Sequence, residues 1–453
     1  MTMHLIMEHV PEGELALYAF NREAVDPARR VAIEQHLGAC ALCQATHDFF
    51  IVADDDLCDA ETWEPIVGSA TYAALMDYGA RVAAEDEEAE VLLEPYIVNP
   101  ARVAWEALTT RRAFQTGGVV RRLNAHAHSI CESDALAALM FADVAIGIAE
   151  ALPNDAYPAG AVNQLRATAW KERANALMLL GRFPGAHDAL DHAERYFGRT
   201  LNNGLGLSMV ALVRAGVYYE QQVYDRAMEH ATRAERGFAH VGDEKRRMVA
   251  VFLRASITME NGDAAAAVTL YRQTIDYGES TENLQMVARG AYGAGNAEVD
   301  RGNLAEASMH FHRALVLFRE VGPEPERVMT EWGIARVLMK AGKLDEAVRR
   351  FREIQAALET HGLMTVAALV GLDIAESLLA LGKPERIALL AKHLFTVFKD
   401  VGMLTGALTA IAYLNDAAAS KRLTVQDVNE IRRFLRRAER QPARAFAPPP
   451  RLP

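Results

Sequence analysis

Between about residues 113 and 420, apolar residues recur at helical spacing, and glycines interrupt them at regular intervals. The glycines stand at positions 242, 262, 302, 322, 342, 362, 382 and 402, so every gap is 20 or 40 residues. Each interval fits a helix of about 15–17 residues that ends where a glycine adopts the left-handed conformation. The pattern predicts antiparallel helix pairs that must stack, because no single pair can bury its apolar face.

Small and aromatic residues repeat with the same period. Alanine follows three of the glycines by five residues, and an aromatic residue recurs at the end of the second helix of a pair (Ala267, Ala307 and Ala347; Phe197, Phe238 and Phe318). Small residues let paired helices approach closely, and the aromatic rings are expected to fill the core. The predicted fold class is therefore all-α, with a helical solenoid as its largest part.

One stretch carries the repeat most clearly. Residues 169–186, in which Ala169-Trp170 precedes Ala174-Asn175-Ala176-Leu177 and Leu180-Gly181-Arg182-Phe183, resemble the first helix and turn of the tetratricopeptide repeat. The period of 40 residues exceeds the usual length of about 34. The resemblance implies a superhelix whose concave groove binds a protein or a peptide. The alternative is that the array serves only as a rigid spacer.

The segments flanking the array have their own patterns. Acidic runs at 54–56 and 85–88 flank residues 57–84. We interpret this stretch as a helical linker, and we expect the acidic side chains to be solvated. After the array, Thr424 can cap an amphipathic helix that extends to Arg440. One side of this helix is apolar and the other is basic (Val425, Val428, Ile431 and Leu435; Arg432, Arg433, Arg436, Arg437 and Arg440). The helix is expected to close the last repeat, with docking on RNA or an acidic partner as the alternative.

These patterns predict five regions. They are a small N-terminal domain at 1–56, the linker at 57–112, the repeats at 113–420, the basic helix at 421–440 and a disordered tail at 441–453 that is rich in proline and alanine.

Charge and composition narrow the function. The chain has 453 residues and a formal net charge of −12, which argues against direct DNA binding because that requires a basic surface. Four cysteines do not make a disulfide framework at this length and suit the reducing cytosol. The N-terminus lacks the basic start and apolar core of a signal peptide. The most apolar run, residues 135–152, contains Asp143 and Glu150 and fits a buried helix. We expect a cytoplasmic protein with no membrane association.

The most informative motif is His36-Leu37-Gly38-Ala39-Cys40-Ala41-Leu42-Cys43. On a helix, steps of four and three residues put His36, Cys40 and Cys43 on one stripe. An imidazole and two thiolates supply three corners of a tetrahedral zinc site. Cys58 and Cys131 are interpreted as additional thiols without a role.

The fourth ligand is expected from another element. His47 continues the stripe but would lie about 16 Å from His36 along a straight helix. His4 and His9 both stand upstream of a short apolar helix at 14–20. A turn follows near Asp26-Pro27, where Asp26 can cap the next helix. Because such a hairpin would return His9 alongside His36, His9 is preferred over His4.

With His9, Tyr18 and the H-x-x-x-C-x-x-C run, residues 1–55 resemble the zinc-binding anti-sigma domain of bacteria. The resemblance implies one structural Zn²⁺ held by His9, His36, Cys40 and Cys43, and a sigma factor as protein partner. In some members of that family the finger only stabilises a helix hairpin, and in others thiol oxidation releases zinc and the sigma factor.

No catalytic motif was found, and a closed four-ligand zinc site leaves no position for water, so we expect a protein that is not an enzyme. The glycine-rich run at 289–295 has no strand before it and is interpreted as helix packing rather than a phosphate loop. The function that the sequence favours is a regulator that binds a sigma factor through its finger and another protein or peptide through its repeats. The alternative is a general interaction scaffold with a purely structural finger.

Overall fold

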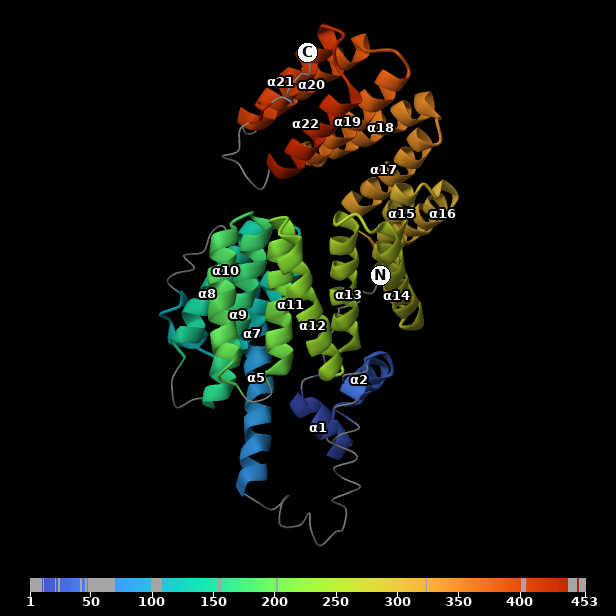
Figure 1. The fold of residues 1–453 in the computed structure, drawn as a ribbon. Coiled ribbons are helices and arrows are strands. Elements are labelled where there is room, and N and C mark those ends of the chain that lie inside the picture. Colours follow the sequence, from blue (N-terminus) through green and yellow to red (C-terminus); the bar gives the residue numbers. More distant parts are fainter. Residues whose placement is uncertain are drawn as a thin grey trace. The chain divides into compact units, whose positions relative to one another are not determined.

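The structure is a computed structural model (Figure 1). It describes residues 10, 12–20, 22, 25–40, 43–44, 47, 70–98, 108–152, 157–200, 203–322, 324–400, 405–438 and 446–447. Two compact units divide the chain, Met1–Ala250 and Val251–Pro453. Helices and turns dominate both, and no strand occurs in the described ranges. The predicted all-α helical-repeat fold is confirmed.

The first unit contains the N-terminal hairpin and the first repeats. Its elements are α1 (Glu12–Phe20), α2 (Pro27–Ala39), α5 (Ala70–Val98), η3 (Arg112–Phe114), α7 (Gly117–Ile130), α8 (Ala135–Glu150), α9 (Ala159–Leu179), α10 (Phe183–Phe197), α11 (Gly204–Glu220) and α12 (Tyr224–His240). Helix α13 (Glu244–Glu260) continues from this unit into the next. The apolar run at 135–152 forms α8, which buries most of its apolar residues as predicted.

The second unit continues the alternation. Its helices are α14 (Ala264–Ser280), α15 (Leu284–Arg301), α16 (Leu304–Val321), α17 (Glu324–Lys340), α18 (Leu344–Thr360), α19 (Met364–Ala380), α20 (Glu385–Asp400), α21 (Thr405–Ala419) and α22 (Val425–Ala438). Among the helices of both units that the structure describes, none is long and apolar enough to span a bilayer.

The turns repeat one hydrogen-bonded geometry. After α15, Gly302 has φ +80°, its N–H donates to the carbonyl of Val299 at 3.0 Å, and the N–H of Asn303 donates to the carbonyl of Glu298 at 2.9 Å. This pair of bonds satisfies carbonyls that the helix end leaves open, and it requires a left-handed residue. The predicted left-handed glycines are confirmed at five further places (Gly242, Gly262, Gly342, Gly362 and Gly382), and Gly181 has the same conformation. The predicted Gly402 lies outside the described residues.

The period also continues where the sequence has no glycine. Gln222 and Glu282 are left-handed, with φ of 61° and 54°, and so fill positions in the 20-residue step. The prediction was wrong at Gly322, which is extended with φ −100° and ψ 157°. The physical reason is local, because Gly322 precedes Pro323 and a residue before proline is restricted to extended conformations.

The predicted core residues are buried. The three alanines that follow the glycines and the three phenylalanines that end helices are at most 3% exposed. The glycines of the 289–295 run lie inside α15, where a Cβ on Gly295 would come within 2.8 Å of the ring of Phe311. This confirms that the run serves helix packing.

Helix α5 packs against α7 instead of standing apart as a solvated linker. Glu85 is half-buried, and its carboxylate accepts hydrogen bonds from the hydroxyl of Tyr157 at 2.8 Å and the N–H of Gly118 at 3.3 Å. Arg121 pairs with the neighbouring Asp86 at 2.7 Å. The expectation of solvated charge was therefore wrong for Glu85. Burial of its carboxylate is compensated by the Tyr157 hydroxyl and by the N–H of Gly118, one of the N–H groups at the start of α7 that have no partner within the helix.

The C-terminal helix α22 closes the second unit. Thr424 and Asp427 cap it reciprocally: the N–H of Asp427 donates to the Thr424 hydroxyl at 3.2 Å, and the N–H of Thr424 donates to the Asp427 carboxylate at 2.9 Å. Val428, Ile431 and Leu435 are fully buried, whereas Val425 is 48% exposed and does not belong to the buried face. Residues 439 and 440 lie outside the described ranges.

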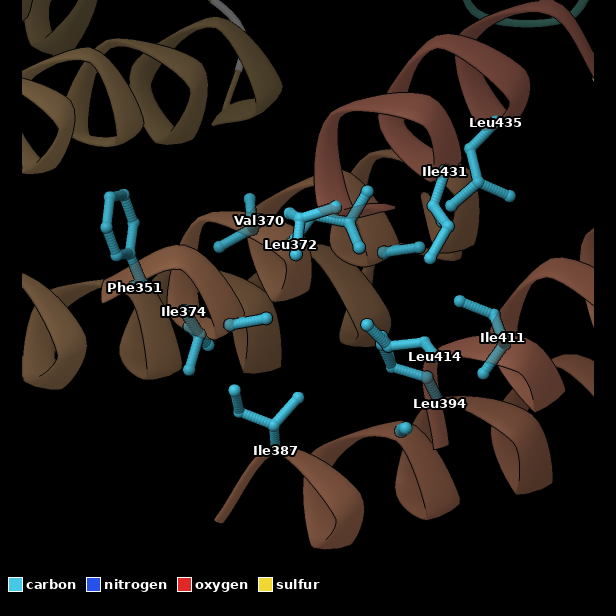
Figure 2. Packing of buried hydrophobic residues seen from close by; sticks show 14 of the residues in the cluster. Phe351, Val370, Leu372, Ile374, Ile387, Leu394, Ile411, Leu414, Ile431 and Leu435 are labelled. Carbon is cyan, nitrogen blue, oxygen red and sulfur yellow. The ribbon is translucent and has the colours of Figure 1, made fainter. Parts of the chain in front are cut away.

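Figure 2 shows Ile431 and Leu435 facing the side chains of α19 and α21 (Val370 and Leu372; Ile411 and Leu414). The predicted disordered tail has one ordered anchor. Phe446 is 9% exposed, and its ring lies 5.2 Å from that of Phe434 between ring centroids. The rest of the tail, apart from residue 447, lies outside the described ranges.

Candidate metal site

The site is built on the α1–α2 hairpin. As predicted, Asp26 caps α2, and its carboxylate accepts from the N–H groups of Ala28 and Arg29 at 2.9 and 3.1 Å. Arg29 also reaches back to α1, where its guanidinium donates to both carboxylate oxygens of Glu14 at 3.0 and 2.7 Å. A bidentate pair of this kind fixes the orientation of two helices as well as their distance.

His36, Cys40 and Cys43 converge at the end of this hairpin. One potential ligand atom from each lies within 4.8 Å of the others. The path of the chain differs from the prediction, because α2 ends at Ala39 and Cys40 is extended, with φ −127° and ψ 101°. The three residues therefore do not share one helical stripe. The backbone turns after Ala39, and the N–H of Gln44 donates to the carbonyl of Cys40 at 2.9 Å, which brings Cys43 back toward Cys40.

Cys43 is the most enclosed of the three. It is 2% exposed and belongs to an apolar cluster with Val10, Leu15, Ile33 and other hairpin residues. Burial, reinforced by the charge of Cys40, raises the pKa of the Cys43 thiol to about 12. The backbone N–H of Val10 donates to the sulfur of Cys43. This contact brings the chain segment that begins at Val10 directly to the site.

The donor set fits zinc. Zinc–sulfur and zinc–nitrogen bonds of about 2.0–2.3 Å in a tetrahedron separate ligand atoms by roughly 3.3–3.8 Å, and the three ligand atoms here all lie within 4.8 Å of one another. A bound cation would replace the thiol protons and remove the mutual repulsion of the two sulfurs. The group can therefore hold a metal. Its fourth corner requires one more ligand.

The other histidines of the N-terminal region are His4, His9 and His47. The ring of His47 packs against that of Tyr18, with 5.5 Å between centroids. His9 and His4, the candidates for the fourth ligand, lie outside the described residues, as does Cys58. Cys131 follows α7 and is buried in a cluster with residues of α8 to α11, and burial raises the pKa of its thiol to about 11.

Buried charged groups on α9 and α19 are among those that were missed from the sequence. Asp373 on α19 is 4% exposed and accepts from the indole Nε1–H of Trp332 at 2.7 Å and from Arg432 at 2.8 Å. Glu172 on α9 is also 4% exposed and pairs with Lys171 and with His128. The signal in both cases is a charge inside an otherwise apolar helical face.

The chain is distantly similar to several solved structures. No protein-family model matches it, and no curated protein matches its sequence. Among solved structures, the apo form of the quorum sensor NprR from B. thuringiensis has a TM-score of 0.47 and 12% identity, covering 79% of this chain and 97% of that one. Aspartyl phosphate phosphatase F from Bacillus subtilis has a TM-score of 0.42 and 14% identity, covering 94% of this chain and 98% of that one.

A tetratricopeptide repeat protein from Parabacteroides merdae has a TM-score of 0.43 and 16% identity, covering 66% of this chain and 98% of that one. With identities and TM-scores at this level, the fold class rests on the helices and turns of the present chain. That class is an all-helical repeat protein with a His/Cys/Cys group at its N-terminal hairpin.

Proposed function

We propose that the chain is a cytoplasmic regulatory protein whose N-terminal region binds one structural Zn²⁺ and, through that fold, a sigma factor. The observation that carries the proposal is the convergence of His36, Cys40 and Cys43 within 4.8 Å at the end of a helix hairpin. The residues of the motif match those of the anti-sigma-type finger. Zinc would hold the hairpin together, and no catalytic role is assigned to it.

His9 is proposed as the fourth ligand. The N–H of Val10 bonds to the sulfur of Cys43, and consecutive Cα atoms are about 3.8 Å apart. Residue 9 therefore precedes a backbone group that already touches a ligand. His4 would have to return over five further residues, so it is the weaker candidate.

The repeats are proposed to bind a second protein or peptide. Stacked helix pairs expose one extended face that a partner can follow. On this proposal residues 1–56 form the finger, 57–112 connect it to the repeats at 113–420, and 421–440 close the array.

The test uses the full-length protein and its Cys40→Ala/Cys43→Ala variant. Wild type purified from zinc-containing medium is expected to contain one zinc per chain by metal analysis, and the variant none. Wild type and not the variant should retain a sigma factor from the host. Cys131→Ala is the matched control, because Cys131 lies far along the chain in a cluster with residues of α8 to α11, and its substitution should change neither result.

A scaffold with a purely structural finger is the second candidate. The hairpin has its own apolar cluster and the Glu14–Arg29 pair, so it has packing that needs no partner. If zinc binds but no sigma factor is retained by wild type, this candidate replaces the first.

A further inference from the structure

Helix α22 departs from the order of packing that the rest of the second unit follows. The other helices pack mainly against their immediate neighbours in the chain, as α16 does against α15 and α17. In contrast, α22 packs against α21 and also against α19, three helices earlier. It thereby covers a face of α19 with the fully buried side chains of Val428, Ile431 and Leu435, of which Figure 2 labels Ile431 and Leu435.

The covered face also carries two carboxylates. Arg432 of α22 donates to Asp373 and to Glu376, both at 2.8 Å. The second oxygen of Asp373 accepts from the indole of Trp332 on α17. A second cation, the ammonium group of Lys340, lies farther from these carboxylates, with its Nζ 3.9 Å from Glu376. The guanidinium of Arg432 is therefore the cation that directly hydrogen-bonds the buried Asp373.

This face sets requirements for whatever occupies it. Without Arg432, Asp373 would be a buried carboxylate held only by a neutral indole donor, which is an expensive state. An occupant must place apolar side chains at positions i, i+3 and i+7 of a helix. It must also place a cation immediately after the second of them, as Ile431 and Arg432 do.

The attachment of α22 is short and contains a strained residue. Residues 420–424 join it to α21, and Lys421 in this turn is left-handed with φ 54°. At equivalent turns most of the array uses glycine, which adopts this conformation without steric cost. A short tether gives α22 an effective concentration on the order of millimolar, so a free helix must bind well to displace it.

We infer that the face of α19 and α21 beneath α22 is a docking groove for a basic amphipathic helix of a partner protein. Helix α22 is its intramolecular occupant, which the partner displaces. The inference rests on the proposed function that the repeats bind a second protein, and it defines that partner's chemistry. The partner helix carries the α22 pattern of apolar residues with an arginine or lysine at the position of Arg432.

The experiment measures binding of a fluorescein-labelled peptide of residues 424–440 to the full-length protein by fluorescence anisotropy. In the Arg432→Glu protein a carboxylate faces Asp373 and Glu376, which should release α22. This variant is expected to bind the peptide at least about tenfold more tightly than wild type does. Hydrogen exchange in α22 should accelerate in the same variant.

Arg433→Glu is the matched control. Arg433 is exposed and pairs with Glu430 on its own helix, so this variant should bind the peptide as wild type does. A peptide that itself carries Arg432→Glu should not bind the released groove. If circular dichroism shows that the Arg432→Glu protein is unfolded, Arg432→Gln removes the cation without adding repulsion, and a smaller gain in the same direction is expected.

Equal peptide binding by wild type and the folded variant would overturn the inference, as would equal binding of the two peptides. Failure of the proposed function is distinguishable. If the peptide binds as expected but no partner protein binds the repeats, the groove stands and the partner function fails. If a partner binds the repeats but the peptide never binds, the groove is wrong and the partner function stands.

Discussion

The phenol ring of Tyr271 fills the space that a side chain at Gly293 would need. A Cβ on Gly293 would lie 2.4 Å from Cε1 of Tyr271, closer than real contacts allow. The ring cannot easily move, because it is 4% exposed and its hydroxyl lies 3.1 Å from Oγ of Ser256. Helices α14 and α15 therefore pack closely because a glycine of one accepts an aromatic ring of the other.

Gly293→Ala is expected to destabilise the second unit by about 1–3 kcal/mol, the usual effect of overpacking a core. Urea denaturation followed by circular dichroism measures the change. Gly79→Ala is the control, because Gly79 lies inside α5 and has open space around the added methyl group. That substitution should be neutral or should stabilise by up to about 1 kcal/mol. Equal effects of the two substitutions would contradict the packing argument.

The helical period was predictable because the turn chemistry is local. A left-handed residue after each helix favours glycine, and glycine is visible in the sequence. Gln222 and Glu282 were not predictable in this way. The two hydrogen bonds of the turn form there as well, to Tyr219 and Tyr218 in one case and to Glu279 and Gly278 in the other. The left-handed turn therefore also forms with glutamine or glutamate, and neither residue type indicates such a turn in the sequence.

Buried polar contacts were harder to predict because their partners are distant in the sequence. Glu85 and Tyr157 are separated by 72 positions, and Asp373 and Arg432 by 59. From the sequence alone each charged side chain is expected to be solvated, because its partner becomes a neighbour only in the folded chain. The convergence of His36, Cys40 and Cys43 was predictable from their spacing, since the three residues span eight positions. The path between them was not, because α2 ends one residue before Cys40.

The left-handed turns can be tested at Gly342. With φ 78° and no atom near an added Cβ, Gly342→Ala is expected to cost about 1 kcal/mol through backbone strain alone. Glu282→Gly removes the same strain from the equivalent turn, but it adds a flexible residue to the unfolded chain. Its effect should therefore lie within about 1 kcal/mol of zero. Thermal melts of both variants measure the contrast, and a larger loss in Glu282→Gly than in Gly342→Ala would refute it.

Glu172 is expected to give the first unit an acid-sensitive component of stability. Burial alone would raise the pKa of Glu172, but Lys171 and His128 lower it to about 2. Because this pKa lies below the ordinary value of 4.5, the stabilisation is complete above pH 4.5 and is lost as the pH falls toward 2.

Glu172→Gln tests this component. At pH 7 it leaves Lys171 buried without its counter-charge and should destabilise by about 3–5 kcal/mol. At pH 3 the loss should be smaller, because the wild-type carboxylate has begun to lose its advantage. The double variant Lys171→Met/Glu172→Gln should recover much of the loss at pH 7, since it leaves no unpaired charge. An equal loss at both pH values, measured by urea denaturation, would exclude the electrostatic explanation.

Glu85 is expected to hold α5 against the array. Its carboxylate receives the Tyr157 hydroxyl and the N–H of Gly118, and Arg121 lies 3.7 Å away. Glu85→Ala removes these acceptors and leaves the donors at the start of α7 without them, which should cost about 1–3 kcal/mol. The loss should be local, so hydrogen exchange should accelerate in α5 and in the first turn of α7 before it does elsewhere in the unit.

Glu87→Ala is the matched control on the same helix, because Glu87 is exposed. It should leave both the melting temperature and the exchange pattern of α5 unchanged within error. If Glu85→Ala and Glu87→Ala behave alike, α5 is held by its apolar contacts, such as the fully buried Leu93, rather than by the carboxylate. If only Glu85→Ala loosens α5, one half-buried carboxylate determines how firmly the helix preceding the repeats is attached to them.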